Sequence, residues 1–300
     1  MDKYPVVSIC CLTYNHESFI RQCINGFLMQ EVNFKYEIIV HDDASIDATQ
    51  EILKQYAKQY PSIFKLILQN ENQYSKGIDV IPLLLSQATG AYIALCEGDD
   101  YWTDPLKLQK QVDFLEREHR YVMCSHVCDY LYNDTAKIIN NIVESDKIYT
   151  IRELVNGEWY FQTLSLVFRR EAINLCTLSK YHTCVDAVLV FELLRYGGFG
   201  MRLKESMGVY RYHNGGDWSQ INMNLRRQQE FKVRFDIYRV APSIDSASMI
   251  LSLWKTPISR KWLIYNNSII WDSFIVLYRH WGFCFTMKLF FRKIFLGKSK

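Results

Sequence analysis

The sequence predicts an α/β fold in which helices cover both faces of a mainly parallel central sheet. Short apolar runs, such as residues 6–12 and 36–40, alternate with stretches whose apolar residues recur at helical spacing, such as 19–28. This alternation is typical of parallel strands joined by helical crossovers. Polar residues directly follow three of the apolar runs, and ligands of such sheets bind at the carboxyl ends of the strands. The pattern therefore predicts where a functional site lies.

The first hundred residues contain four predicted strands with helical stretches between them. Continuous apolar runs predict buried strands at residues 6–12, 36–40, 64–68 and 92–95. Apolar residues at helical spacing predict helices around residues 19–28, 52–56 and 80–88. A further helix should begin at Asp104 and Pro105, which suit the cap and the first helical position.

The second half is less regular and ends in helices. It contains predicted strands at residues 122–130, 164–169 and 208–212, and a predicted helix at residues 186–196. Beyond residue 220 every apolar pattern is helical. We therefore expect a first domain over residues 1–220, which contains the site, and a helical extension over residues 221–300.

Composition excludes several function classes. Apolar residues make up 49% of the 300 residues and charged residues 22%, which predicts a folded core. A net charge of +3 gives no electrostatic case for a nucleic-acid binder. The nine cysteines include no Cys-x-x-Cys pair, so neither a disulfide framework nor a zinc site is indicated. Residues 1–5 do not resemble a secretion signal, so we expect a cytoplasmic protein.

Three predicted strands end in polar segments, at residues 13–16, 41–47 and 97–100. Carboxylates gathered at one edge of a sheet repel each other and favour a neutralising cation. Oxygen ligands select a hard ion such as Mg²⁺ or Mn²⁺. An acidic tetrapeptide at 97–100 would by itself be a solvated turn, but its place beside two other polar strand ends favours a site.

The segment at residues 41–47 has two interpretations. Ser45 or Asp47 could simply cap the next helix. Capping does not require the consecutive aspartates Asp42 and Asp43, however. A carboxylate there could accept the imide N–H of a uracil-type base while its neighbours reach ribose hydroxyls.

Taken together, these motifs resemble a known family. Residues 13–15, 42–47 and 97–105 are similar in order and spacing to the family 2 glycosyltransferases of GT-A fold, and in particular to the bacterial surface-polysaccharide type. Residues 159–170 and 209–216 also resemble that group, so the similarity covers roughly residues 4–220. The resemblance implies a metal-dependent transferase that uses a nucleotide-activated sugar.

The resemblance also implies roles for individual residues. The Asp-x-Asp element, which binds the metal and the diphosphate, reads Glu97-Gly98-Asp99 here, so Asp99 is the expected metal ligand. Glu97 could instead act on the ribose or through water. The residues expected to bind the nucleotide are Thr13, Tyr14, Asn15, Asp42, Asp43, Glu97 and Gly98.

Three residues of the second half match positions that are functional in the family. Asp186, at the start of a predicted helix, matches the general base that deprotonates the acceptor hydroxyl. Its alternative role is a helix cap worth ~0.3–1 kcal/mol, and a helix N-terminus would lower its pKa and weaken a base. His213 could complete the metal shell, touch the diphosphate or be an ordinary surface residue. Arg211 could contact phosphate or pair with a carboxylate.

The segment at residues 262–300 is rich in aromatic residues that charged residues interrupt. It offers no clean stretch of about 20 apolar residues to span a bilayer. Aromatic residues combined with terminal lysines and arginines suit a helix lying in the membrane interface. The alternatives are a helical cap packed on the catalytic domain and a dimer surface.

The resulting hypothesis is an inverting hexosyltransferase, metal-dependent through Mg²⁺ or Mn²⁺, whose donor is a nucleoside-diphosphate sugar. By resemblance the donor is a UDP-sugar and the acceptor a polysaccharide or lipid-linked glycan. The chain would then lie peripherally on the inner face of the plasma membrane. A nucleotidyltransferase would need a glycine- and lysine-rich loop where residues 13–16 stand. A non-catalytic sugar-binding assembly subunit fits poorly with intact Asp42, Asp99 and Asp186.

Overall fold

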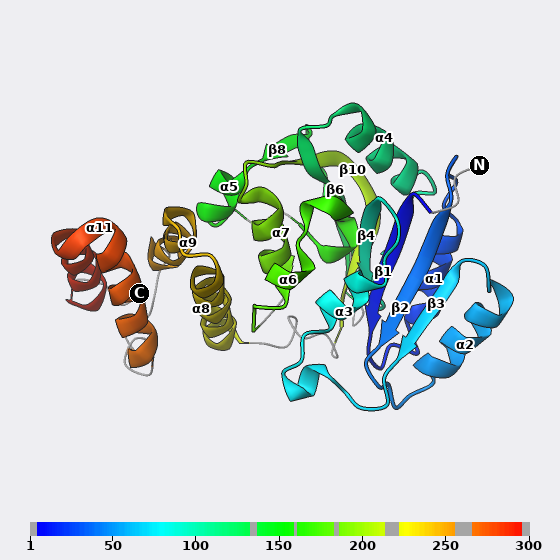
Figure 1. The fold of residues 1–300 in the computed structure, drawn as a ribbon, viewed down its shortest axis with the longest axis horizontal. Coiled ribbons are helices and arrows are strands. Elements are labelled where there is room, and N and C mark those ends of the chain that lie inside the picture. Colours follow the sequence, from blue (N-terminus) through cyan, green and yellow to red (C-terminus); the bar gives the residue numbers. More distant parts are fainter. Residues whose placement is uncertain are drawn as a thin grey trace. The chain divides into compact units, whose positions relative to one another are not determined.

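The computed structural model describes residues 5–132, 137–158, 161–182, 186–213, 222–255 and 266–295. The chain forms two compact units (Figure 1). The first contains Met1–Thr150 and Tyr160–Ser219, and the second contains Ile151–Trp159 and Gln220–Lys300. Some residues of the predicted motifs and tail lie outside the described residues, namely 159–160, 183–185, 214–216, 262–265 and 296–300.

Four strands of the first unit run parallel, as predicted. They are β1 (Val7–Thr13), β2 (Tyr36–Asp42), β3 (Phe64–Leu68) and β4 (Tyr92–Glu97), arranged in the order β3-β2-β1-β4. Their register pairs Thr13 with Asp42 and Leu12 with Glu97. The predicted polar strand ends therefore meet at one edge of the sheet.

Helices cover both faces of this sheet, because alternate strand residues are apolar on each side. Val7, Ile9 and Cys11 belong to a buried cluster with residues of α1 (Ile20–Leu28), α2 (Thr49–Gln59) and α4 (Lys107–Arg117). Cys10 and Leu12 lie on the opposite side, where α3 (Val80–Ser86) packs. The prediction of an α/β fold covered on both faces is confirmed.

The sheet of the first unit continues as a mixed sheet. Its further strands are β5 (Tyr101–Trp102), β6 (Tyr121–Tyr132), β7 (Lys137–Ile139), β8 (Lys147–Tyr149), β9 (Val167–Arg169) and β10 (Phe199–Tyr212). β10 is parallel to β6, whereas β9 lies antiparallel between β4 and β6. The predicted strand at 164–169 begins instead as a 3-10 turn, η2 (Thr163–Ser165). The predicted strand at 208–212 is the end of the longer β10.

Two helices and two short 3-10 turns complete the first unit. The helices are α6 (Leu175–Leu178) and α7 (Asp186–Leu194), and the turns are η1 (Tyr74–Lys76) and η3 (Arg170–Ala172). α7 begins at the predicted residue and packs against β6.

The second unit is helical over its described residues. It consists of α5 (Ile151–Val155), α8 (Met223–Val240), α9 (Ile244–Lys255) and α11 (Asn267–Phe295). Phe231, Trp254, Leu277 and Phe290 form the centre of its hydrophobic core. α11 kinks at Gly282, whose φ of 79° is easily adopted only by glycine. Among the described residues, no helix is long and apolar enough to cross a membrane.

Candidate active site

The predicted site lies at the carboxyl ends of β1, β2 and β4, and Gly98 lets their loops pack closely. A Cβ atom at Gly98 would lie 2.6 Å from Thr13 Oγ1 and 2.9 Å from His16 Nδ1. The Gly98 amide also donates to the Leu12 carbonyl at 2.8 Å. A side chain at position 98 would therefore force the loop after β4 away from Thr13 and His16.

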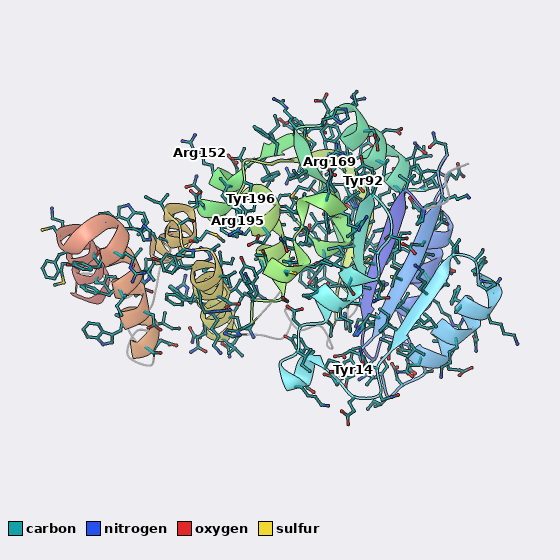
Figure 2. All side chains as sticks on the ribbon, viewed as in Figure 1. Tyr14, Tyr92, Arg152, Arg169, Arg195 and Tyr196 are labelled. Atoms are coloured by element: carbon teal, nitrogen blue, oxygen red, sulfur yellow. The ribbon has the colours of Figure 1, made fainter. Side chains whose placement is uncertain are left out.

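The turn after β1 is fixed to the loop after β2. Asn15 has a φ of 54°, a left-handed conformation that asparagine tolerates better than most residues. Its amide donates to Ser45 Oγ at 2.8 Å, and its side-chain oxygen accepts from the Ile46 amide at 2.9 Å. Tyr14, which the turn projects outward, is 42% exposed (Figure 2). The sequence predicted these residues for nucleotide binding, and the structure brings them together.

Both predicted base-binding aspartates are buried and hold loops in place. Asp42 accepts from Gln50 Nε2 at 2.6 Å and from the amide of Ser45 at 2.9 Å, both through Oδ1. Asp43 accepts the amides of Gln73 and Tyr74 at 2.8 and 3.0 Å, one on each carboxylate oxygen. Asp42 Oδ2 also accepts from Ser45 Oγ at 2.5 Å, so Asp42 accepts three hydrogen bonds through its side chain and Asp43 accepts two.

Asp99 and two histidines form a cluster whose atoms could hold a cation. His213 Nε2 lies 2.9 Å from Asp99 Oδ2, and His16 Nε2 lies 4.0 Å from the same oxygen. Candidate ligand atoms of all three residues lie within 4.8 Å of one another. Neighbouring ligands of an octahedral Mg²⁺ are separated by roughly 3 Å, so the spacing fits a small divalent ion. The predicted residues Asp99 and His213 meet here.

Electrostatics favour the ligand-competent protonation states of Asp99 and His16. Burial acts to raise the pKa of Asp99, but the hydrogen bond from His213 and the nearby His16 outweigh it, and the pKa is lowered. Burial lowers the pKa of His16, which keeps its imidazole neutral near pH 7. A carboxylate beside a neutral imidazole is a donor set that divalent ions accept.

Sequence reasoning did not assign His16 or Asp100 to the site. His16 stood in the motif after β1, but only the fold shows that it faces Asp99. Asp100 is buried, and its Oδ1 accepts the Arg211 amide at 2.8 Å. Its Oδ2 has no hydrogen-bond partner among the described residues. Burial, together with the charges of Asp99 and Glu97, raises its pKa, so it favours a proton or a nearby cation.

Arg211 connects the acidic loop, residues 97–100, to α1. Its Nε donates to the Asp99 carbonyl at 2.8 Å, and its guanidinium donates to Gln22 Oε1 at 2.7 Å. It also lies over the rings of Phe19 and Tyr101. These contacts fix the backbone of the acidic loop against α1.

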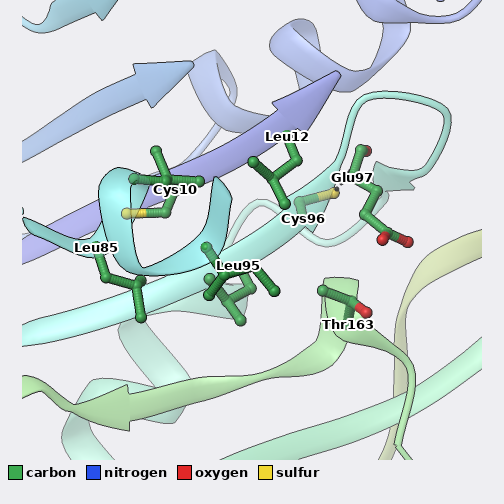
Figure 3. Close-up of a pocket in the computed structure, with 9 residues that line it drawn as sticks. Cys10, Leu12, Leu85, Leu95, Cys96, Glu97 and Thr163 are labelled. Atoms are coloured by element: carbon green, nitrogen blue, oxygen red, sulfur yellow. Dashed lines mark hydrogen bonds between the residues drawn. The ribbon is translucent and has the colours of Figure 1, made fainter. Parts of the chain in front are cut away.

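Glu97 lies beside a small apolar hollow on the α3 side of β4. The hollow is lined by residues of β1, β4 and α3 and by Thr163 of η2 (Figure 3). Leu12, Leu95 and Cys96 form much of its wall. The side chain of Glu97 is half-buried, and its carboxylate lies near that of Asp99.

Asp186 begins α7 and is not a member of the His16–Asp99–His213 cluster found among the described residues. Its Oδ1 accepts the Ala187 amide at 2.8 Å. Burial nevertheless raises its pKa to about 6, although the Ala187 hydrogen bond lowers it. The amide at the helix N-terminus lowers this pKa as expected, but desolvation is the larger effect and sets the net direction.

Residues 8–175 match the Glycosyl transferase family 2 family. The chain belongs to glycosyl transferase family 2. A relative of this family 2 chain is the "Uncharacterized protein Rv1520" of Mycobacterium tuberculosis, 37% identical over 229 residues. That alignment covers 74% of this chain and 63% of the relative. A second is the "Putative teichuronic acid biosynthesis glycosyltransferase TuaG" of Bacillus subtilis, 25% identical over 70% of this chain and 80% of TuaG.

Solved structures share the fold of this family 2 chain. S. aureus TarS 1–349 in complex with UDP-GlcNAc matches with a TM-score of 0.65 and 15% identity, over 90% of this chain and 82% of TarS. The mannosyltransferase PcManGT of Pyrobaculum calidifontis, in complex with GDP-Man and Mn²⁺, matches with a TM-score of 0.53 and 14% identity. That match covers 98% of this chain and 88% of PcManGT. At this identity the likeness shows the GT-A fold.

Proposed function

We propose that this protein is an inverting, metal-dependent glycosyltransferase that moves a sugar from a nucleoside diphosphate to a glycan acceptor. The observation that carries the proposal is the His16–Asp99–His213 cluster at the end of β4, next to the loops of Asn15 and Asp43. A nucleotide lying across β2 and β1 would place its diphosphate at β4. Membership of family 2 supports this reaction over nucleotidyl transfer.

The nucleotide would be held by the predicted strand-end residues. Asp43 is the better placed aspartate for a base N–H, because its side chain accepts two hydrogen bonds where Asp42 accepts three, and it is the less completely buried of the two. Asp42 would instead maintain the turn through Ser45. TarS binds UDP-GlcNAc and PcManGT binds GDP-Man, and the ring N–H of either base suits a carboxylate acceptor; the TarS match has the higher TM-score, 0.65 against 0.53. We therefore favour a UDP-sugar donor.

Asp99, His213 and His16 would hold the divalent ion. When bound, the ion supplies positive charge that stabilises the departing diphosphate. Two imidazoles beside one carboxylate favour Mn²⁺ over Mg²⁺, because imidazole nitrogen is a softer donor than oxygen. The presence of Mn²⁺ with PcManGT agrees with this preference.

Asp186 would serve as the general base. With a pKa of about 6 its carboxylate is largely ionised at neutral pH, yet it is more basic than an exposed aspartate. It would take the proton of the acceptor hydroxyl as the hydroxyl oxygen forms a bond to the anomeric carbon. The bond to the diphosphate oxygen breaks on the opposite face, so the configuration inverts.

The acceptor is proposed to be a surface polysaccharide or a lipid-linked glycan, in line with the name of TuaG. We also propose that the second unit contacts the membrane peripherally, on the inner face of the plasma membrane. The support is a set of exposed apolar side chains on α11, which are Trp271, Ile275, Tyr278, Phe283, Phe285 and Met287.

A screen of nucleotide sugars tests the function directly. The purified chain is incubated with UDP- and GDP-linked hexoses and N-acetylhexosamines, with Mn²⁺, Mg²⁺ or EDTA, and nucleotide release is measured. The proposal expects release from at least one donor that EDTA abolishes. Release from none of the donors, together with no nucleotide binding by calorimetry, would overturn it.

A further inference from the structure

Four tyrosines gather at the carboxyl ends of β6 and β10. The strands are parallel, and their register sets Tyr130 beside Tyr210 and Tyr132 beside Tyr212. The rings of Tyr132 and Tyr212 stack with centroids 4.8 Å apart at 11°. Tyr212 also meets Tyr210 at 5.1 Å and Tyr130 at 5.8 Å. The four rings form one continuous group, which we call the tyrosine cluster.

Tyr210 of the tyrosine cluster lies near the acidic loop, because burial and then the charges of Glu97, Asp100 and Asp99 raise the pKa of its phenol. Arg211 lies between Tyr210 and Tyr212 and points toward α1, where it meets Gln22. Because side chains alternate along a strand, the two tyrosines point to the opposite side. Tyr130 accepts a hydrogen bond from Gln162 Nε2 at 3.0 Å.

Gln162 connects the cluster to the donor side of the site. The next residue, Thr163, lines the hollow that also contains Glu97. From the other direction, the Arg211 amide donates to Asp100 Oδ1 at 2.8 Å, so the strand bearing Tyr210 and Tyr212 is bonded to the acidic loop. The cluster is therefore adjacent to the place where the donor sugar would lie.

In the sheet, the predicted nucleotide residues and the tyrosine cluster lie on opposite sides of β4. The predicted nucleotide residues lie on β1 and β2, whereas the tyrosines lie on β6 and β10, beyond β4 in the order β3-β2-β1-β4-β9-β6-β10. A nucleotide over β1 and β2 leaves the β6 and β10 side for the other substrate. The rings also retain accessible surface, and Tyr132 is 37% exposed.

We propose that Tyr130, Tyr132, Tyr210 and Tyr212 form the subsite that binds a pyranose ring of the acceptor glycan. Aromatic faces pack against the apolar C–H face of a pyranose, while phenol hydroxyls exchange hydrogen bonds with its hydroxyl groups. The assignment of this pyranose to the acceptor rests on the proposed function. The binding of a pyranose by itself does not depend on it.

Saturation-transfer NMR on the full chain tests the inference. The probes are methyl glycosides of glucose, galactose, mannose and N-acetylglucosamine, each at millimolar concentration without a nucleotide. We expect saturation of the ring protons of at least one glycoside by the unsubstituted protein. Tyr132→Ala and Tyr212→Ala should weaken that binding about threefold to tenfold, and Tyr212→Phe should retain it because the ring remains.

Tyr196→Ala is the matched control. Tyr196 is 77% exposed and lies across the first unit from Tyr14 (Figure 2). The control should bind the glycoside like the unsubstituted protein, and thermal unfolding checks that every variant is folded. The inference is overturned if no glycoside binds, or if folded Tyr132→Ala and Tyr212→Ala bind it unchanged.

A parallel titration with UDP-sugars separates this inference from the proposed function. Glycoside binding that depends on the tyrosines without any nucleotide-sugar binding would sink the transferase proposal and leave the pyranose subsite. Nucleotide-sugar binding, together with glycoside binding that the tyrosine substitutions leave unchanged, would overturn the pyranose subsite and leave the transferase proposal standing.

Discussion

The carboxylate of Asp99 lies 2.9 Å from Nε2 of His213, although the two residues are 114 positions apart in the sequence. Asp99 follows β4, and His213 follows β10. Two residues before His213, the Arg211 amide donates to Asp100 Oδ1 and anchors the end of β10 to the acidic loop. The second half of the first unit therefore supplies one member of the His16–Asp99–His213 cluster, whose other two members come from the first half.

Asp99→Asn should abolish cation-dependent nucleotide binding and transfer while the protein stays folded. The amide keeps the shape of the side chain but removes the charge that would hold a divalent ion. Calorimetry of UDP with Mn²⁺ and a turnover assay check this. Turnover within a few-fold of the unsubstituted protein would show that Asp99 is not a ligand.

Gly98→Ala should disturb the site more than the fold. The new Cβ would lie 2.6 Å from Thr13 Oγ1 and 2.8 Å from Thr13 Cβ, so the turn after β1 must move. Such overpacking costs about 1–3 kcal/mol and shifts His16 away from Asp99. We expect lower affinity for Mn²⁺ and nucleotide in titrations. Gly197→Ala, strained by its φ of 87° at the end of α7, should leave these affinities unchanged.

The sequence predicted the site as far as local patterns reach. Strand ends located Thr13, Asp42 and Asp99, because parallel strands bring their carboxyl ends to one edge. The contacts of Arg211 with the Asp99 carbonyl and Gln22, and of His16 with Asp99, were not predictable, since each of them joins segments far apart in the sequence. The strands β5, β7 and β8 were also missed, because two or three residues carry no period-2 signal and form only through pairing.

Asp186→Asn should cut turnover by roughly 10²–10⁴-fold and leave donor binding nearly intact. In the unsubstituted protein, turnover should rise with pH up to about 6 and then level off, because burial raises the pKa of Asp186 to about 6 and only the ionised form accepts a proton. Steady-state kinetics from pH 5 to 8 measure this limb. A loss of donor affinity with unchanged turnover would assign Asp186 to binding.

Asp100→Asn should stabilise the cation-free protein at neutral pH. Burial and the charges of Asp99 and Glu97 raise the pKa of Asp100, so the folded state binds a proton that the unfolded state releases above about pH 4. The free energy of unfolding therefore falls as the pH rises from about 4 to the raised pKa of Asp100. The amide keeps an acceptor for the Arg211 N–H without this loss. Urea unfolding in EDTA should show a gain at pH 8 that shrinks toward pH 5, and a gain independent of pH would contradict the assignment.

The structure divides the apolar residues of α11 into two groups. Val276, Leu277 and Phe290 are buried in the core of the second unit, as expected for a packed helix. Trp271 and Phe283 are instead 66% and 58% exposed. Deleting the segment from residue 262 would expose the core and confuse misfolding with release from a membrane. Point substitutions of the exposed group avoid this problem.

Trp271→Ser with Phe283→Ser should therefore reduce flotation with anionic liposomes while the protein stays folded. Each side chain would lose the apolar area that it buries in the interface, worth about 1.5–3 kcal/mol if burial is complete. Nearby Arg279 and Lys288 would add ~1 kcal/mol each at low salt, so high salt should weaken binding of the unsubstituted protein.

The matched control is Ile148→Ser, an exposed apolar residue on β8 of the first unit. If the unsubstituted protein fails to float, or if the double variant floats as well as the control, α11 does not bind lipid. Gel filtration at several protein concentrations would then test whether these exposed residues contact a second copy of this chain.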